Sequence, residues 1–379
     1  MSLNLSLPKS WTSRLRRPQA GWIGVDVGTS AIKLAQVERS KGTWRIAGSA
    51  LIPLPGATQD SGLPADDSAW QDLLRPVRRS RVFRGTAAAA VLPMAMLDLR
   101  SLDLPDGSPA ELRQMIAQEL EASGPEGDRE FAFWKTSQPG SSQTPAQFSV
   151  LAVPRTVATR AAERLLEAGL RCEVLDVLPF ALARSIQLAA PGASARPRAA
   201  LDWGAASAVF TLAVDGRPAF TRCFRECGVM PLQDAVCHGL GLSAGEARQV
   251  LASCGVPVPH LYPGSEPRPQ RSSPDPSTSR IQTAIGEFAA PVIRRIVVEL
   301  RKTLAWIEQQ SGRPPAEIWL CGGGAIVRNM AECLSAEVGL PVRRWRLPDA
   351  PSGDRPDDAA ESLFATAAAL SALHWEDGP

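Results

Sequence analysis

Residues 22–34 read WIGVDVGTSAIKL, and residues 199–210 read AALDWGAASAVF. Each stretch has the form of an apolar strand that ends in an Asp-x-Gly motif, which begins at Asp26 in the first copy and at Asp202 in the second. In both copies a further strand and a polar turn follow. Self-similarity at such a long spacing predicts a duplicated architecture in which two equivalent loops face each other.

Facing glycine loops that each carry an acidic residue suit a ligand made of polyphosphate and a metal ion. Backbone N–H groups of such loops can surround phosphates, and carboxylates hold Mg²⁺, usually through water. We therefore expect Asp26 and Asp202 to be magnesium ligands of this indirect kind.

Composition sets the broad class of the protein. The chain has 379 residues, of which 44% are hydrophobic and 21% charged, values ordinary for a soluble globular protein with two or more domains. A net charge of +2 gives no indication of nucleic-acid binding. No apolar run approaches the roughly 18–20 residues that span a bilayer. Seven cysteines without paired spacing favour a reducing cytoplasm, and no CxxC pair or second histidine supports a zinc site near Cys223, Cys227, Cys237 and His238.

The first 20 residues are expected to form a flexible basic arm. They contain no acidic residue, and their large apolar side chains are scattered. A frayed terminus is the favoured interpretation. A weak contact with an anionic membrane surface or an acidic partner is the alternative. The cations are Lys9, Arg14, Arg16 and Arg17, and the large apolar residues are Leu3, Leu5, Leu7 and Trp11.

Residues 93–176 have their own order of predicted strands and helices. Strand, helix, strand, strand, helix and strand follow in about 85 residues, the last strand running from Cys172 to Leu178. This order predicts a small α+β subdomain inserted into the first half. The first half itself would then comprise residues 21–92 and 177–198.

The second half is expected to span residues 199–350. It would include a helical subdomain at about 229–310, interrupted by a Pro- and Ser-rich flexible loop at 257–279. A strand then enters three successive glycines at 322–324. An Ala-rich C-terminal helix within 351–379 would return to the first half.

Two Asp-x-Gly loops on matching strands, followed by a strand and three glycines, resemble the actin-like ATPase superfamily. The resemblance implies an α/β, two-lobed, duplicated ribonuclease H-like fold with the inserted α+β subdomain, and ATP and Mg as cofactors. Carried over residue by residue, it implies nucleotide contacts from Asp26, Gly28, Thr29, Ser30 and Lys33 in the first loop, Asp202, Gly204 and Ser207 in the second, and Gly322, Gly323 and Gly324 in the third.

In this superfamily a helix also supplies a glutamate and basic residues to the nucleoside. By resemblance, Glu299 would hold the ribose hydroxyls, Lys302 would flank the base, and Thr303 would lie beside them. A solvated charged helix face is the alternative interpretation of this segment.

Within the superfamily the chain is similar to the PilM family of type IV pilus assembly proteins, which is related to FtsA. The similar stretches are residues 24–34, 175–183, 299–304, 320–325 and 364–370. The resemblance implies a scaffold in the cytoplasm, peripheral to the inner membrane, that binds the N-terminal cytoplasmic tail of a PilN-like membrane protein. The tail would lie in a groove between the inserted subdomain and the first half. The machine would be a pilus or a related secretion system.

Two departures from the family pattern bear on activity. Ala205 and Ala206 follow the second Asp-x-Gly where hydroxyl residues are usual, which leaves Ser207 alone and favours at most slow ATP hydrolysis. Residues 123–128 replace a proline-rich stretch next to the expected peptide groove.

Three function classes remain in view. A sugar kinase-like phosphotransferase would need a base over the γ-phosphate, and no catalytic residue or sugar-recognition segment is identified. An FtsA-like filament would use surfaces that sequence does not reveal, so self-association stays open. The favoured hypothesis is a scaffold that binds ATP and a partner peptide, without nucleic acid and with only peripheral membrane contact.

Overall fold

The structure is a computed structural model. The arm at 1–18 and most of the loops predicted at 257–279 and before the C-terminal helix lie outside the described residues. The structure describes residues 19–54, 72–75, 77, 81–123, 128–136, 146–192, 194–258, 276–348 and 356–376.

The first sheet has the order β4-β3-β2-β5-β9, and β1 pairs with the far end of β3. Strands β2, β3 and β4 form an antiparallel meander, whereas β5 is parallel to β2 and β9 is parallel to β5. The strands are β1 (Gln19–Ala20), β2 (Ile23–Val27), β3 (Ala31–Ser40), β4 (Thr43–Pro53), β5 (Ala87–Val91) and β9 (Arg171–Asp176).

The second sheet repeats this plan. Its order is β12-β11-β10-β13-β14, again with an antiparallel meander followed by two parallel strands. The duplication predicted from the two Asp-x-Gly motifs is therefore present in the topology. The strands are β10 (Arg198–Trp203), β11 (Ala208–Val214), β12 (Arg217–Phe224), β13 (Ile318–Cys321) and β14 (Val342–Arg344).

One predicted strand has a different place. The segment from Cys172 to Leu178 was expected to close the inserted subdomain, but β9 pairs in parallel with β5 of the first sheet. The repeat explains this, because β9 occupies the position that β14 occupies in the second sheet. Period and length predict a strand here, but they do not predict which sheet it joins.

The inserted unit is a three-stranded antiparallel sheet of order β6-β8-β7. Helix α3 packs on one face, where Ile116 meets Phe148 and Val150. On the other side, Trp134 meets Phe180 of α5 edge-on, at 5.4 Å between ring centres, which joins the unit to the first half. The elements of this part of the chain are the 3-10 turn η1 (Met94–Met96), β6 (Asp98–Leu104), α3 (Pro109–Ser123), β7 (Arg129–Lys135), β8 (Ala146–Pro154) and α4 (Arg155–Glu167), and α5 (Leu178–Ala189) follows in the first half.

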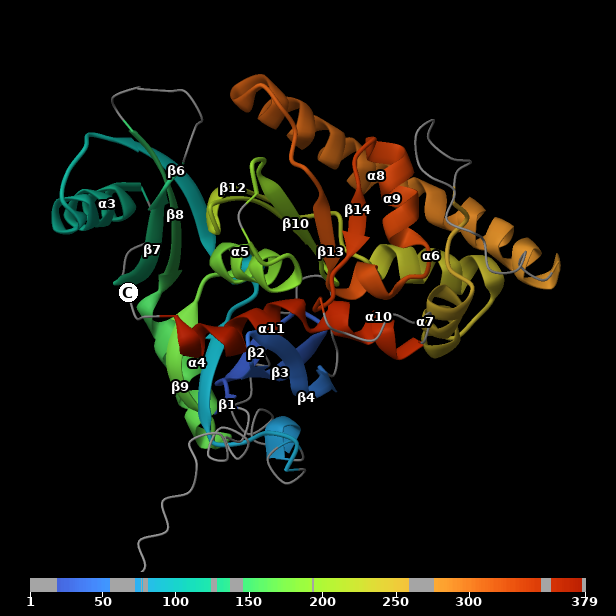
Figure 1. Cartoon of the computed structure of the whole chain (residues 1–379), viewed down its shortest axis with the longest axis horizontal. Helices are drawn as coiled ribbons and strands as arrows, with labels where there is room; N and C mark the ends of the chain where they lie inside the picture. The colour runs from blue at the N-terminus through green and yellow to red at the C-terminus, as the bar shows by residue number, and fades with distance from the viewer. Residues whose placement is uncertain are drawn as a thin grey trace, which may run out of the picture.

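Two helices lie between the sheets. Figure 1 shows α11 (Ala365–Ala372), in red, between the blue strands and the green helix α5. All residues of α11 are buried, and small side chains let the helix approach the strands closely. A Cβ at Gly24 of β2 would collide with the carbonyl oxygen of Ala367, so glycine is required at this crossing. The indole of Trp345 donates to the carbonyl of Ser185 at 2.8 Å and ties α5 to the second half.

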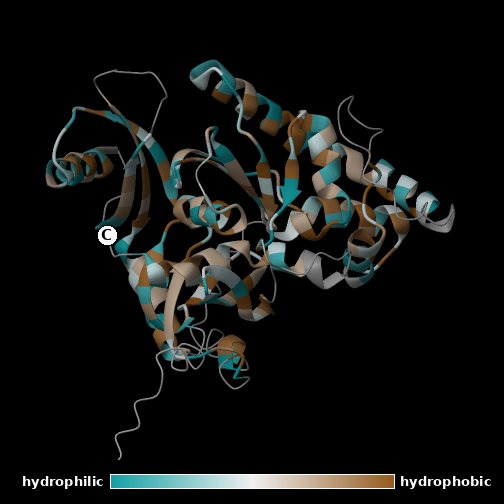
Figure 2. Cartoon of the chain, in the orientation of Figure 1, coloured by the Kyte–Doolittle hydropathy of each residue, from teal (hydrophilic) through white to brown (hydrophobic). Residues whose placement is uncertain are grey.

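Helices α6 and α8 cover the outer face of the second sheet, where their apolar side chains share one core with the strands. Ser243 and Glu246 form the predicted capping box at the start of α7. Figure 2 shows that α8 alternates between hydrophobic and hydrophilic stripes, as expected of a helix with one buried face. Among the described residues no helix has the length and apolar character to cross a membrane. The elements are α6 (Met230–Leu240), α7 (Ala244–Ser253), α8 (Pro276–Ser311), the 3-10 turn η2 (Gly323–Ile326), α9 (Met330–Val338), α10 (Pro356–Leu363) and the 3-10 turn η3 (Leu373–Trp375).

Candidate functional site

The two Asp-x-Gly motifs form equivalent loops. In each loop four residues lie between the two members of the last cross-strand pair, 28–31 between Val27 and Ile32 and 204–207 between Trp203 and Ala208. A Cβ at Gly28 would lie 3.0 Å from the carbonyl oxygen of Ala31, and a Cβ at Gly204 would lie 3.0 Å from that of Ser207. Each glycine is therefore required by the tight turn of its own loop, and the two turns are equivalent.

Each loop is held from behind by the chain of its own half. The amide of Leu54, just after β4, donates to the carbonyl of Ser30 at 2.9 Å. In the second half, the amides of Val229 and Met230 donate to the carbonyls of Gly204 and Ala205 at 2.9 and 3.0 Å. Loops fixed in this way hold their backbone before any ligand arrives.

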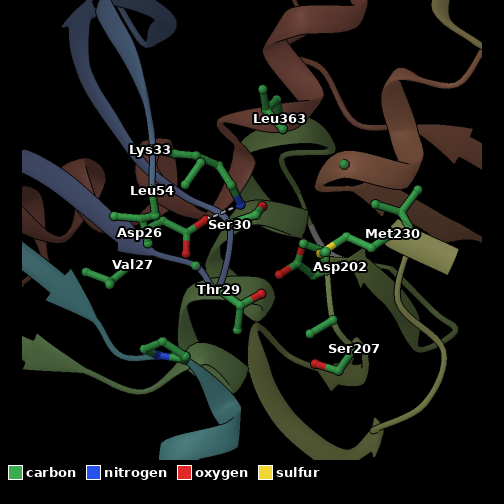
Figure 3. Close-up of a pocket in the computed structure, with 18 of the residues that line it drawn as sticks. Asp26, Val27, Thr29, Ser30, Lys33, Leu54, Asp202, Ser207, Met230 and Leu363 are labelled. Carbon is green, nitrogen blue, oxygen red and sulfur yellow. Dashed lines mark hydrogen bonds and ion pairs between the residues drawn. The ribbon is translucent and has the colours of Figure 1, made fainter. Parts of the chain in front are cut away.

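A cavity of about 550 Å³ lies between the two loops. This size falls in the range of small-molecule sites. Figure 3 shows the side chains of both loops around it, with Asp26 and Asp202 on opposite sides. Residues from all three predicted loops line the cavity: Asp26, Gly28, Thr29, Ser30, Lys33, Asp202, Gly204, Ser207 and Gly323.

Lys33 and Asp26 form an ion pair inside this cavity. The ammonium lies 2.6 Å from Asp26 Oδ2, and the two side chains are only 11% and 8% exposed. Burial lowers the pKa of Lys33, but the nearby carboxylates of Asp26 and Asp202 outweigh it and raise that pKa above its ordinary value. Lys33 therefore stays charged between two carboxylates.

Asp202 has fewer hydrogen-bond partners than Asp26 among the described residues. It is buried, and its Oδ1 has no hydrogen-bond partner among the described residues. Burial, opposed by the charge of Lys33 and reinforced by that of Asp26, raises the pKa of Asp202 to about 6. An unpartnered buried carboxylate oxygen needs a proton, water or a cation.

The raised pKa of Asp202 predicts a pH-dependent stability for the protein without ligand. In the unfolded chain this carboxyl titrates near 3.8, so between about pH 4 and pH 6 the native state binds more protons than the unfolded state. The free energy of unfolding should therefore fall as the pH rises through this window. Urea denaturation of the wild type and of Asp202→Asn across this range measures the effect. The asparagine variant should lack this component and be the more stable protein at pH 7.5; equal pH profiles for the two proteins would contradict the prediction.

The three glycines before η2 play separate roles. Gly322 has φ +77°, and a Cβ there would strike Asp202 Oδ1. A Cβ at Gly324 would meet the indole of Trp203, so this glycine permits packing, whereas Gly323 faces the cavity. The 3-10 turn η2 follows them, and helix α9 begins at Met330.

The residues predicted on the long helix lie outside the lining of this cavity. Arg222 of β12 bonds Glu299 at 2.5 Å and donates to the hydroxyl of Thr303 at 2.9 Å, and Lys302 bonds Glu299 at 2.8 Å. None of the three predicted residues lines the cavity. This network fits the alternative interpretation, a charged helix face whose groups satisfy one another.

The lining of the cavity also includes residues that were not predicted. Gln233 of α6 and Arg248 of α7 line the cavity from the second half, and Met94 and Leu363 add apolar surface. No motif marks these positions, since they reach the cavity through the packing of α6 and α7 against the sheet. Arg248 supplies a cation that the sequence-based site lacked.

These residues fit a nucleotide with its magnesium ion. The loops offer glycines and hydroxyls, Lys33 and Arg248 offer positive charge, and the carboxylate of Asp202, which lines the cavity, offers a partner for metal-bound water. Within the described part of the chain, no group of three or more His, Cys, Asp or Glu side chains could hold a metal ion alone. A metal here would thus depend on the phosphates for most of its ligands.

Comparison with known proteins gives consistent matches. The chain is similar in structure to that of a PilM–PilN type IV pilus biogenesis complex, at 22% identity and a TM-score of 0.70, covering 94% of this chain and 99% of that one. It is also similar to the ethanolamine utilization protein EutJ from Carboxydothermus hydrogenoformans, at 16% identity and a TM-score of 0.53, covering 94% and 90%. At these identities the likeness concerns the fold, and it confirms the predicted two-lobed actin-like class.

The sequence itself matches a family model. The model described as type IV pilus assembly protein PilM matches residues 24–258, which is more than half of the chain and includes both Asp-x-Gly loops. The chain therefore belongs to the PilM family of type IV pilus assembly proteins.

Proposed function

We propose that this protein is an ATP-binding scaffold of type IV pilus assembly, or of a related secretion machine, on the cytoplasmic side of the inner membrane. It would bind the N-terminal cytoplasmic tail of a PilN-like membrane protein. The observation that carries the nucleotide part is the cavity between two equivalent glycine loops, with Lys33 and Asp26 on one side and Asp202 on the other.

In this proposal the chain's own residues divide the work of holding Mg-ATP. The backbone of residues 28–31 and 204–207 would receive the phosphates, Lys33 and Arg248 would balance their charge, and Asp26 and Asp202 would hold the magnesium ion through water. The bound ion supplies charge neutralisation of the phosphates. The second loop has one hydroxyl, on Ser207, and no described group is assigned as a base for an attacking water, so we propose slow hydrolysis at most.

A nucleotide in this cavity would contact both halves of the chain. Contacts to both loops favour the conformation in which the loops are close, and a ligand shifts an equilibrium by its difference in affinity for the two states. We propose that this closure changes the affinity for the PilN-like tail. The tail would dock where the three-stranded sheet meets the first half, near Trp134 and Phe180. The similar solved structure is of a protein in complex with PilN, which supports this choice of partner.

The proposal is tested by titrating the purified chain with Mg-ATP and then with a synthetic tail peptide from the PilN-like protein of the same genome. We expect a rise in melting temperature with Mg-ATP, and peptide binding, measured by fluorescence anisotropy, that differs with and without nucleotide. A peptide of scrambled sequence is the control.

Distinct results would contradict each part. No thermal response to Mg-ATP would contradict nucleotide binding. Equal binding of the scrambled peptide would contradict specific recognition of the tail. Rapid phosphate release that depends on one sugar would instead identify a phosphotransferase. Pelleting of the protein with Mg-ATP would identify a filament.

A further inference from the structure

The tip of the β3–β4 hairpin is an exposed turn far from the cavity. Ser40 pairs with Thr43, which leaves Lys41 and Gly42 as a two-residue turn with φ of 51° and 85°. Positive φ at both positions is typical of the type I′ turn that matches strand twist. Strand β3 has 10 residues, so the tip lies about 30 Å from the cleft end of the strand.

The tip is rich in positive charge. Arg39 and Lys41 are exposed, and no described carboxylate pairs with either of them. On the other face of the hairpin, Arg45 and Arg84 both pair with buried Glu38 while their own side chains remain 63% and 61% exposed. Of the four cations, only Arg45 and Arg84 pair with a described carboxylate, and both use Glu38.

The duplicated half shows that the turn does not require this charge. The equivalent turn in the second sheet has Asp215 and Gly216 at its centre, with φ of 49° and 77°. It carries a carboxylate where the first turn carries Lys41. A Cβ at Gly216 would strike Gln187 of α5, whereas no described atom lies within 4 Å of the same position at Gly42. The first turn is thus open and basic, and the second is packed and acidic.

Aromatic side chains flank the tip. Trp44 lies under the guanidinium of Arg39 at 5.2 Å and meets Trp375 edge-on at 5.0 Å. His374 adjoins Trp375 at 5.0 Å and Trp22 at 5.5 Å, and all four rings are half-buried. Tryptophan is favoured where one end of the ring is apolar and the other meets water, as at the surface of a bilayer.

Strand β1 joins the hairpin near its tip. Its two residues, Gln19 and Ala20, pair with Arg39 and Glu38 of β3.

We infer that the β3–β4 tip and the adjoining tryptophans form a docking surface for the anionic phospholipids of a membrane. Basic residues mixed with half-exposed tryptophans fit the charged, interfacial layer of a bilayer. An acidic protein partner would match the positive charge of the tip, but it would not explain why tryptophans lie beside that charge. The inference does not depend on nucleotide or tail binding, since the tip lies away from the cavity.

Sedimentation of the full chain with lipid vesicles tests this surface. We expect binding to phosphatidylcholine vesicles that contain about a third phosphatidylglycerol, weakening as salt is added, and none to phosphatidylcholine alone. Because each basic residue near such a surface contributes roughly fivefold, the variant Arg39→Gln/Lys41→Gln should bind at least about tenfold more weakly. Its melting temperature and its response to Mg-ATP should equal those of the wild type.

Two matched variants test the place of the charge. Arg217→Gln/Arg225→Gln removes two exposed cations from the second half, and Asp215→Lys puts a lysine in the equivalent turn; neither should change vesicle binding. A tenfold change in either would overturn the inference, because net charge would then suffice. Equal binding to both kinds of vesicle, or binding of a synthetic acidic peptide but of neither vesicle, would also overturn it.

Discussion

Replacing Lys33 with methionine is expected to abolish the stabilisation by Mg-ATP and to lower the free energy of unfolding by about 3–5 kcal/mol. Lys33 and Asp26 are both buried, so the variant leaves Asp26 without its cation and close to Asp202. Methionine keeps the length and apolar stem of the side chain, so the change concerns charge. Urea denaturation and thermal shift with Mg-ATP measure the two effects.

A second variant separates stability from binding. In Asp26→Asn/Lys33→Met both charges of the pair are gone, and most of the lost stability should return because no carboxylate is left unpaired at position 26. The response to Mg-ATP should stay absent, since the proposed phosphate and metal contacts are missing. A normal thermal shift in Lys33→Met would contradict the role of Lys33 in nucleotide binding, and unchanged stability would contradict the energetic weight of the ion pair.

Replacing Gly24 with valine is expected to prevent the chain from folding. A Cβ at Gly24 would overlap the backbone oxygen of Ala367, and backbone atoms cannot move aside as the end of a side chain can. The strand and α11 would have to separate, which opens the core of the first half at a cost above about 4 kcal/mol. Soluble yield and the far-ultraviolet circular dichroism melt measure the outcome.

The control for this variant is Gly245→Ala. Gly245 lies in the first turn of α7 with nothing described within 4 Å of its Cβ position, so alanine should leave the melting temperature unchanged or slightly raised. A cooperative melt of Gly24→Val near the wild-type temperature would show that the helix can shift, and would contradict the packing argument.

The parts of the site that were predicted from sequence are those that depend on the residues of a single turn. The Asp-x-Gly motifs end in glycines that the turn itself needs, so the motifs, the strands and the facing loops could all be inferred from a few neighbouring residues. The third loop was located for the same reason, although only Gly323 among its glycines lines the cavity.

The parts that were not predicted depend on packing between distant segments. Arg248 reaches the cavity from α7, which packs against α6, and no local sequence pattern predicts this contact. Glu299 was assigned to the nucleoside by resemblance, and its ion pair with Arg222 of a distant strand could not be read from the sequence around it. The membership of β9 in the first sheet likewise became evident only from its pairing with β5.

The position of α11 has a consequence for synthesis. Strand β2 ends at residue 27, and the helix that covers it begins at residue 365, so the first sheet cannot complete its core until almost the whole chain has been translated. At ribosomal speeds of about 5–20 residues per second, the delay is roughly 20–70 s. During this interval the nascent first half exposes apolar strands, and a chaperone that covers them should raise the yield of native protein.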